Sequence, residues 1–327
     1  MARGARTKVA IGAVVVMAIS PAVAAKRATI ECPRAGACLG TSGPDRILGT
    51  PGRDDVRGRD GNDVMDGKSG ADVMRGGGGL DSVRGGDGDD TLYAGPVADT
   101  RRQEFEWLRG GRGRDVLYGG VLDHLSGDEG ADVLYGSRGL QWLLGGDGDD
   151  VLHGEGGHDY YFFQGSWGHD VVFDSPPREP GRLENYIGFT EVYVDLTIDL
   201  RSDAAAPEVS TADASLTIDW ANDAITMVQS GDGDDTIHGN ALENLISTAG
   251  DDVVYGHEGD DVVQQGSWSN VTVDMGEGDD EVTMWDEAPG TPDVIDCGEG
   301  DADEVTYDPE DTVVNCEILH EVPFNRQ

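Results

Sequence analysis

The sequence predicts an all-β repeat protein, and three observations carry this prediction. Glycine and aspartate recur in units of nine residues over much of the 327-residue chain. Each unit has one apolar residue at its eighth position, inside a three-residue stretch that fits a short strand. Between two repeat blocks, residues 192–200 alternate apolar and other residues, which is typical of a half-buried strand.

The first repeat block is the most regular part of the chain. Six consecutive nonapeptides run over residues 40–93, and each has glycine first and fourth, aspartate sixth and an apolar residue eighth. The sixth-position aspartates are Asp45, Asp54, Asp63, Asp72, Asp81 and Asp90. The eighth-position residues are Ile47, Val56, Met65, Met74, Val83 and Leu92.

Two further blocks repeat the pattern less strictly. Residues 110–173 carry Asp115, Asp132, Asp150, Asp159 and Asp170 at the sixth position, and residues 230–283 carry Asp235, Asp252, Asp261 and Asp280. Gln141, Asn244 and Asn270 replace the aspartate in their units, and residues 119–126 lack the spacing. We expect these departures to be poor metal sites.

The repeat resembles the hemolysin-type, or RTX, calcium-binding nonapeptide with the pattern G-G-x-G-x-D-x-U-x. The resemblance implies a parallel β-roll, a β-solenoid in which multiple Ca²⁺ ions lie between neighbouring turns. The sixth-position aspartates named above are then the expected calcium ligands. Because two units make one coil, Asp54, Asp72 and Asp90 should line one edge, and Asp45, Asp63 and Asp81 the other.

Elementary chemistry agrees with this resemblance. Glycine adopts the positive-φ turns that bring backbone carbonyls together, and Ca²⁺ takes six to eight oxygen ligands. One apolar residue in nine makes a thin core, so bound metal should supply much of the stability. The alternative is that the aspartates only satisfy backbone groups in turns, as aspartate commonly does.

The segments between the repeats define the expected organisation. It comprises a signal peptide (1–25), an N-terminal cap (26–39), the three repeat blocks (40–93, 110–173 and 230–283), a loop insert (94–109), a β-rich insert (174–229) and a C-terminal cap (284–327). We interpret residues 94–109 as a surface loop, although residues 104–108 would also fit a helical turn. We expect residues 174–229 to extend the solenoid without metal, or to pack on it as a separate β insert.

The first residues are typical of an export signal. Arg3, Arg6 and Lys8 precede an apolar run over residues 9–19, and small residues around Ala24 fit a cleavage site. The alternative, a membrane anchor, needs an apolar run of about 20 residues. We therefore expect a secreted, extracellular protein without membrane insertion.

Four cysteines lie near the two ends of the chain. Export implies an oxidising compartment, where disulfides are the ordinary state of cysteine. We favour Cys32–Cys38 and Cys297–Cys316, because each pair is close in sequence and closes one end. A zinc site is the alternative, but neither spacing matches a zinc knuckle.

The formal charge is −41, and it becomes −44 when the three cations of residues 1–25 are removed. This charge argues against nucleic acid or an anionic membrane surface as a partner. Disorder or bound cations would each explain so much acid. The fixed spacing of the aspartates favours bound cations.

No catalytic pattern stands out. The chain has neither an H-E-x-x-H zinc motif nor a G-x-S-x-G elbow, and its histidines mostly occupy variable repeat positions. We expect a calcium-binding structural or surface-associated module that is not an enzyme. Two alternatives stay open: an adhesin that binds a cell-surface or extracellular polymer through its inserts, and a polysaccharide hydrolase or lyase on the solenoid.

Overall fold

The computed structural model describes residues 27–34, 37–96, 105–174, 185–201, 208–211, 215–220, 225–265, 269–284 and 292–322. All regular structure in these ranges is β-strand. The expected signal peptide lies outside them. In the described part of the chain, no helix is long and apolar enough to cross a membrane.

The strands belong to two large sheets, and successive strands in the repeat blocks alternate between them. The first sheet contains, in spatial order, β1 (Ala28–Glu31), β3 (Asp45–Leu48), β5 (Val64–Ser69), β7 (Ser82–Asp87), β9 (Glu106–Arg112), β11 (Leu122–Glu129), β13 (Leu140–Asp147), β15 (Tyr160–Phe163), β17 (Asn185–Phe189), β21 (Ile225–Gln229), β23 (Leu245–Thr248), β25 (Val262–Gln265), β27 (Glu281–Thr283), β29 (Glu304–Tyr307) and β31 (Ile318–Glu321). The second sheet contains β2 (Ala37–Leu39), β4 (Asp55–Asp60), β6 (Val73–Gly78), β8 (Thr91–Tyr93), β10 (Val116–Tyr118), β12 (Val133–Tyr135), β14 (Val151–His153), β16 (His169–Asp174), β20 (Ser215–Trp220), β19 (Glu208–Ser210), β18 (Thr197–Asp199), β22 (Thr236–His238), β24 (Val253–Glu258), β26 (Thr272–Glu277), β28 (Val294–Asp296) and β30 (Thr312–Val314).

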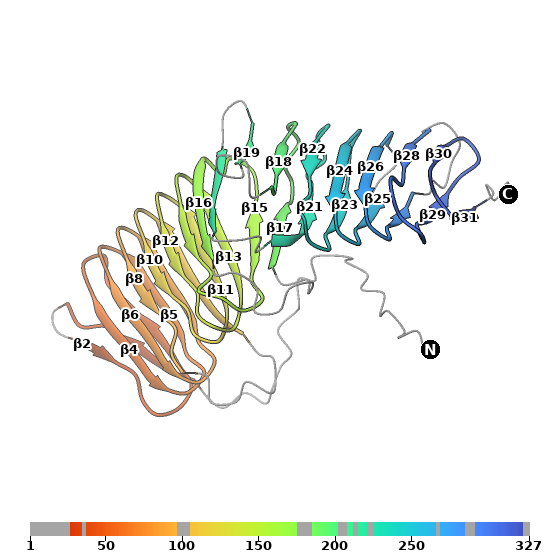
Figure 1. Ribbon diagram of the computed structural model, residues 1–327. Coiled ribbons are helices and arrows are strands. Elements are labelled where there is room, and N and C mark those ends of the chain that lie inside the picture. Colours follow the sequence, from red (N-terminus) through yellow and green to blue (C-terminus); the bar gives the residue numbers. More distant parts are fainter. Residues whose placement is uncertain are drawn as a thin grey trace, which may run out of the picture.

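The coils stack into one elongated solenoid (Figure 1). In the first block, each strand pairs in parallel with the strand 18 residues further on, so Val56 lies beside Met74 and Met74 beside Leu92. These three side chains are fully buried in one inward row, as predicted. The predicted parallel β-solenoid is therefore confirmed.

The core is a narrow double row of apolar side chains between the two sheets. Eighth-position residues such as Ile47, Leu117 and Leu134 are fully buried, while the residues on either side of them are more exposed. Near the end of the second block, Phe163, Trp167 and Phe189 contact one another in the buried core. Larger aromatic side chains thus fill the core where the glycine-rich repeat stops.

Residues 94–109 differ from the loop that we expected. Strand β9 begins at Glu106, and Leu108 is buried between Val83 and Leu125 of the neighbouring coils. The strand was not recognised because an insertion lengthens the step between equivalent strands from 18 to 25 residues. Residues 97–104 lie outside the described ranges.

The insert of residues 174–229 extends the solenoid. Strands β17 and β21 continue the first sheet, and β18, β19 and β20 continue the second. Two pairings there, β18–β19 and β19–β20, are antiparallel, unlike those of the repeat blocks. The predicted strand over residues 192–200 is regular only at Thr197–Asp199, and Val194, expected on the buried face, is 52% exposed.

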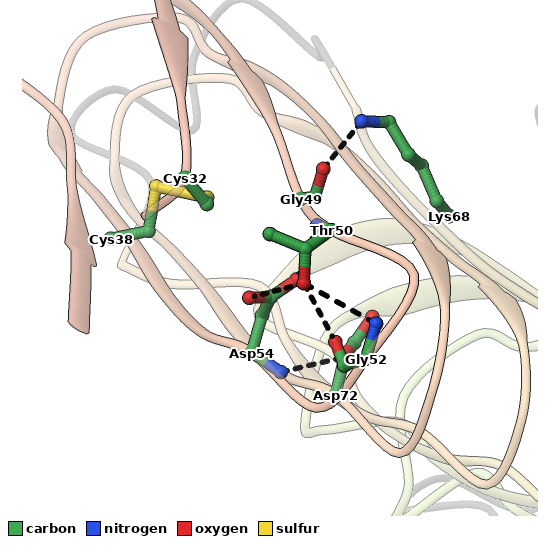
Figure 2. Close-up of a disulfide and its surroundings, with 8 residues drawn as sticks. All are labelled: Cys32, Cys38, Gly49, Thr50, Gly52, Asp54, Lys68 and Asp72. Atoms are coloured by element: carbon green, nitrogen blue, oxygen red, sulfur yellow. Dashed lines mark hydrogen bonds between the residues drawn. A yellow bond between two sulfur atoms is a disulfide. The ribbon is translucent and has the colours of Figure 1, made fainter. Parts of the chain in front are cut away.

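Both predicted disulfides are present. Cys32 is bonded to Cys38 with a Cα–Cα distance of 5.1 Å, and Cys297 to Cys316 with 5.2 Å. Cys38 and Cys297 are buried against the hydrophobic core near the two ends of the solenoid. Figure 2 shows the first bridge beside the earliest repeat turns.

Candidate metal centre

The sixth-position residues form two columns along the solenoid, one on each edge. The first column precedes the first-sheet strands and contains Asp45, Asp63, Asp81, Glu106, Asp123, Gln141, Asp159, Asn185, Asn244, Asp261, Asp280 and Asp303. The second precedes second-sheet strands and contains Asp54, Asp72, Asp90, Asp115, Asp132, Asp150, Asp170, Asp235, Asp252, Asp293 and Asp311. All aspartates expected from the sequence lie in these columns, and each is at least 95% buried.

One carboxylate oxygen of each typical aspartate joins successive coils. The backbone N–H of Asp54 donates to Oδ1 of Asp72 at 2.7 Å (Figure 2). The backbone N–H of Asp72 donates in turn to Oδ1 of Asp90 at 2.7 Å. The other column repeats this bond between Asp45 and Asp63 at 2.8 Å. The alternative role, in which aspartate satisfies backbone groups in turns, therefore explains the hydrogen bonds of Oδ1 but not the position of the second oxygen.

The second oxygen, Oδ2, is buried and has no hydrogen-bond partner in most of these residues. This holds for Asp63, Asp72, Asp81, Asp90, Asp115, Asp132, Asp150, Asp159, Asp170, Asp261 and Asp280. The terminal residues Asp45 and Asp54 differ, because the backbone N–H groups of Thr41 and Thr50 donate to their Oδ2 atoms. Leaving a buried carboxylate oxygen unsatisfied is costly, so the interior positions require a positive partner.

Backbone carbonyls crowd the same place. A Cβ on Gly58 would lie 2.3 Å from Oδ2 of Asp63 and 2.4 Å from the carbonyl oxygen of Gly76 in the next coil. Only glycine lets these two acceptor oxygens approach the turn so closely. Among the described residues, no three His, Cys, Asp or Glu side chains converge on one point. The carboxylate and carbonyl oxygens that do meet here are the two kinds of ligand that Ca²⁺ takes.

Burial also favours neutralisation of these carboxylates. It raises the pKa of Asp72 and of Asp81 to about 7, against the opposing hydrogen bond from the preceding coil, and neighbouring aspartates add to the rise. Burial raises the pKa of Asp159 to about 9, with help from Asp174. A proton or a cation can lower the free-energy cost of burying these charged carboxylates, and a cation can also bind the nearby carbonyl oxygens.

Where the aspartate is replaced, a nitrogen donor faces the oxygens instead. Nε2 of Gln141 donates to the carbonyl oxygens of Gly120 and Val121 at 3.2 and 3.3 Å. Nδ2 of Asn244 donates to Oδ1 of Asn240 at 3.1 Å. These amide nitrogens place a donor where an ion would need an acceptor, which fits the expectation that they are poor metal sites, although Oε1 of Gln141 is itself buried without a hydrogen-bond partner.

Asn270, another of the predicted departures, needs correction. Asn270 does not stand in the column, because it is the N–H of the next residue, Val271, that donates to Oδ1 of Asp293 at 2.7 Å. Asn270 instead contacts Asp251 through its backbone N–H. The unit is shifted by one residue, so Val271 holds the column position that we expected for Asn270.

The comparison with known families matches this geometry. The RTX calcium-binding nonapeptide repeat matches residues 39–74, 66–100, 104–121, 123–140, 141–172, 220–241 and 243–264, more than half of the chain. The chain belongs to the RTX calcium-binding repeat family. RTX nonapeptides bind calcium ions, and the columns supply suitable oxygens. No curated protein matches the chain in sequence.

The sequence prediction did not include six of the column residues: Glu106, Asp123, Asn185, Asp293, Asp303 and Asp311. Asp123 lies within residues 119–126, which we expected to lack the spacing, so that expectation is corrected. Glu106 and Asp123 are fully buried, and neither oxygen of Glu106 nor Oδ1 of Asp123 has a hydrogen-bond partner. Burial, together with the Asp123 and Asp81 carboxylates, raises the pKa of Glu106 to about 9. The available signal was an apolar residue two positions later, Leu108 and Leu125, as in a regular unit.

Proposed function

We propose that this protein is exported and that calcium binding along its two aspartate columns drives its folding into a non-catalytic structural module. The observation that carries the proposal is the series of buried, unpartnered Oδ2 atoms beside backbone carbonyls. The proposed ligands are the fifteen aspartates predicted from the sequence, with Glu106 and Asp123 added. Export rests on the sequence of residues 1–25 alone.

The columns explain why folding should depend on the ion. Without a cation, successive buried carboxylates repel one another and remain half-satisfied, while the apolar core is only one side chain wide per strand. Calcium contributes its binding free energy only when neighbouring turns are stacked, so binding and folding are coupled. Mg²⁺ requires a tighter octahedron and releases water reluctantly, so it should substitute poorly.

The test is circular dichroism of residues 26–327 with chelator, with millimolar Ca²⁺ and with millimolar Mg²⁺. We expect β-structure to form in Ca²⁺ and to be largely lost in chelator, with Mg²⁺ close to chelator. Metal analysis at saturation should find several calcium ions per chain. Equal β-structure in all three conditions would contradict the proposal.

A second candidate function, adhesion, has one observation in its favour. Trp107 and Tyr193 come from the two inserts and are 57% and 72% exposed. Exposed aromatic side chains are common anchors in recognition surfaces. Replacing both with serine should abolish binding to a glycan array if the protein is an adhesin, while calcium-dependent folding should not change. Unchanged binding, or no binding by the parent protein, would argue against this second function.

The enzyme alternative would need a cleft with acids and bases. A groove of about 620 Å³ lies along the first sheet and includes Asp128 and Glu129. Arg109 forms an ion pair with Asp128, and Arg112 forms one with Glu129 at 3.0 Å. These pairs occupy two of its carboxylates, and no observation at this groove favours catalysis over the structural role.

A further inference from the structure

The solenoid has two open ends. In the described chain, β1 and β2 pair with neighbours on one side only, and so do β30 and β31 at the opposite end (Figure 1). An unpaired edge presents backbone N–H and C=O groups that can bind another strand.

The C-terminal end exposes apolar side chains, and one of them belongs to a core row. Leu319 pairs with Val305 and continues the inward row, yet it is 54% exposed while Val305 is fully buried. Ile318 and Val314, which pair with Glu304 and Asp296 outside the core rows, add apolar surface at this end and are 38% and 44% exposed. At the other end, Ile30 continues the inward row of Ile47 and is only partly buried.

The two ends also differ in charge. Residues 26–60 carry seven Lys or Arg and five Asp or Glu. Residues 293–322 carry eleven Asp or Glu and neither Lys nor Arg. In a chain of formal charge −41, a basic end is unusual, and opposite ends of this kind attract each other.

We propose that the protein assembles head to tail, with the C-terminal end of one copy docked on the N-terminal end of a second copy. Strand β31 pairs with β1 of the second copy, and Leu319 lies against Ile30, which continues the inward row. That register places His320 beside Glu31 and brings the acidic C-terminal coil against Arg27. Because the two surfaces differ, the contact repeats from copy to copy and builds linear arrays.

The first test is sedimentation of residues 26–327 in millimolar calcium over a hundredfold range of concentration. We expect the average mass to rise above that of a monomer with concentration. Raising the salt from 0.05 to 1 M should weaken assembly, because charge interactions are then screened within about 3 Å. A monomer at every concentration would overturn the proposal.

Charge reversal gives the sharper test. E310R/E321R and R27E/R34E should each assemble at least tenfold more weakly than the parent, because like charges then face each other. An equimolar mixture of the two variants should regain assembly at least to dimers, because the unaltered acidic end of one variant meets the unaltered basic end of the other. Self-assembly of either variant at parental strength, or a mixture that stays monomeric, would contradict the proposal.

A core-row variant and a lateral control complete the design. Leu319→Asn should weaken assembly, whereas Val194→Asn, on an exposed side position far from both ends, should not. Circular dichroism in calcium must show a folded chain for every variant, which separates a failure to assemble from a failure to bind calcium. Equal losses in both variants would mean that the contact is not at the end.

Discussion

The first column changes character along the solenoid, and the two parts of it are instructive to compare. In the first block, Asp63 and Asp81 each leave one buried oxygen without a donor. Three coils later the same column holds Gln141, whose amide nitrogen donates to two backbone carbonyls of the preceding coil. The backbone path continues through both parts with the same parallel pairing.

The fold requires strand pairing and buried apolar residues in every coil, whereas calcium should matter only to the coils that carry an aspartate. The coil accepts either an aspartate or an amide, because in both cases buried apolar residues and strand pairing hold it. The aspartate units carry a negative charge on a buried oxygen, whereas the Gln141 side chain is neutral and donates from Nε2 to two carbonyl oxygens. Oε1 of Gln141 is itself buried without a hydrogen-bond partner, so the two kinds of unit differ in charge and in the donor rather than in full satisfaction. Calcium dependence should therefore be a property of each unit, and exchanging the side chains should exchange the dependence.

The largest single-residue effect should come from closing the space between the oxygens. In Gly58→Ala, the new methyl would lie within 2.4 Å of Oδ2 of Asp63 and the Gly76 carbonyl, so one coil must shift. We expect a loss of about 2–3 kcal/mol in unfolding free energy in calcium. The matched control is Gly43→Ala, whose methyl meets nothing within 4 Å. Equal stability of the two variants in urea unfolding would show that the site is not tight.

The next effect is an exchange of side chains between the two kinds of unit. Asp72→Asn should remove about one calcium per chain and lower stability in calcium by about 1–3 kcal/mol, while making the chelated chain less unstable. Gln141→Asp should destabilise the chelated chain by a similar amount and add a calcium-dependent coil. Urea unfolding with and without calcium measures both. Identical calcium dependence in the two variants would refute the unit-by-unit account.

The last effect concerns pH in chelator. The pKa of Asp72 and Asp81 is about 7 in the folded chain and 3.8 in the absence of burial. Their protonation therefore favours the folded state fully below pH 3.8, and this contribution disappears as the pH rises through 7. The chelated chain should show more β-structure at pH 4.5 than at pH 7.5, and calcium should bind more weakly at the lower pH. Loss of structure on acidification in chelator would contradict the burial argument.

The regular repeat made most of the fold predictable. Glycine, aspartate and an apolar residue at fixed positions determine the turn, the column and the inward row of Val56, Met74 and Leu92. The prediction was wrong where the spacing changed, at Glu106 and Val271, because insertions move a unit out of phase without changing its role in the coil. The antiparallel pairings of β19 depend on contacts that no local pattern specifies.

The site was predictable to the level of residue type. The sequence indicated which aspartates lie on which edge, and the structure places them there with Oδ1 bonded between coils. The sequence did not indicate that Gln141 and Asn244 supply hydrogen-bond donors of their own, because those contacts depend on the direction in which each side chain points. The calcium role of each aspartate stays a prediction.

The most direct measurement is anomalous diffraction from crystals grown with calcium. The account predicts anomalous peaks beside Oδ2 of Asp63, Asp72, Asp81 and Asp90, between neighbouring turns, and no peak beside Nε2 of Gln141. Aspartate columns whose Oδ2 atoms meet only water or N–H donors in calcium-saturated crystals would contradict it.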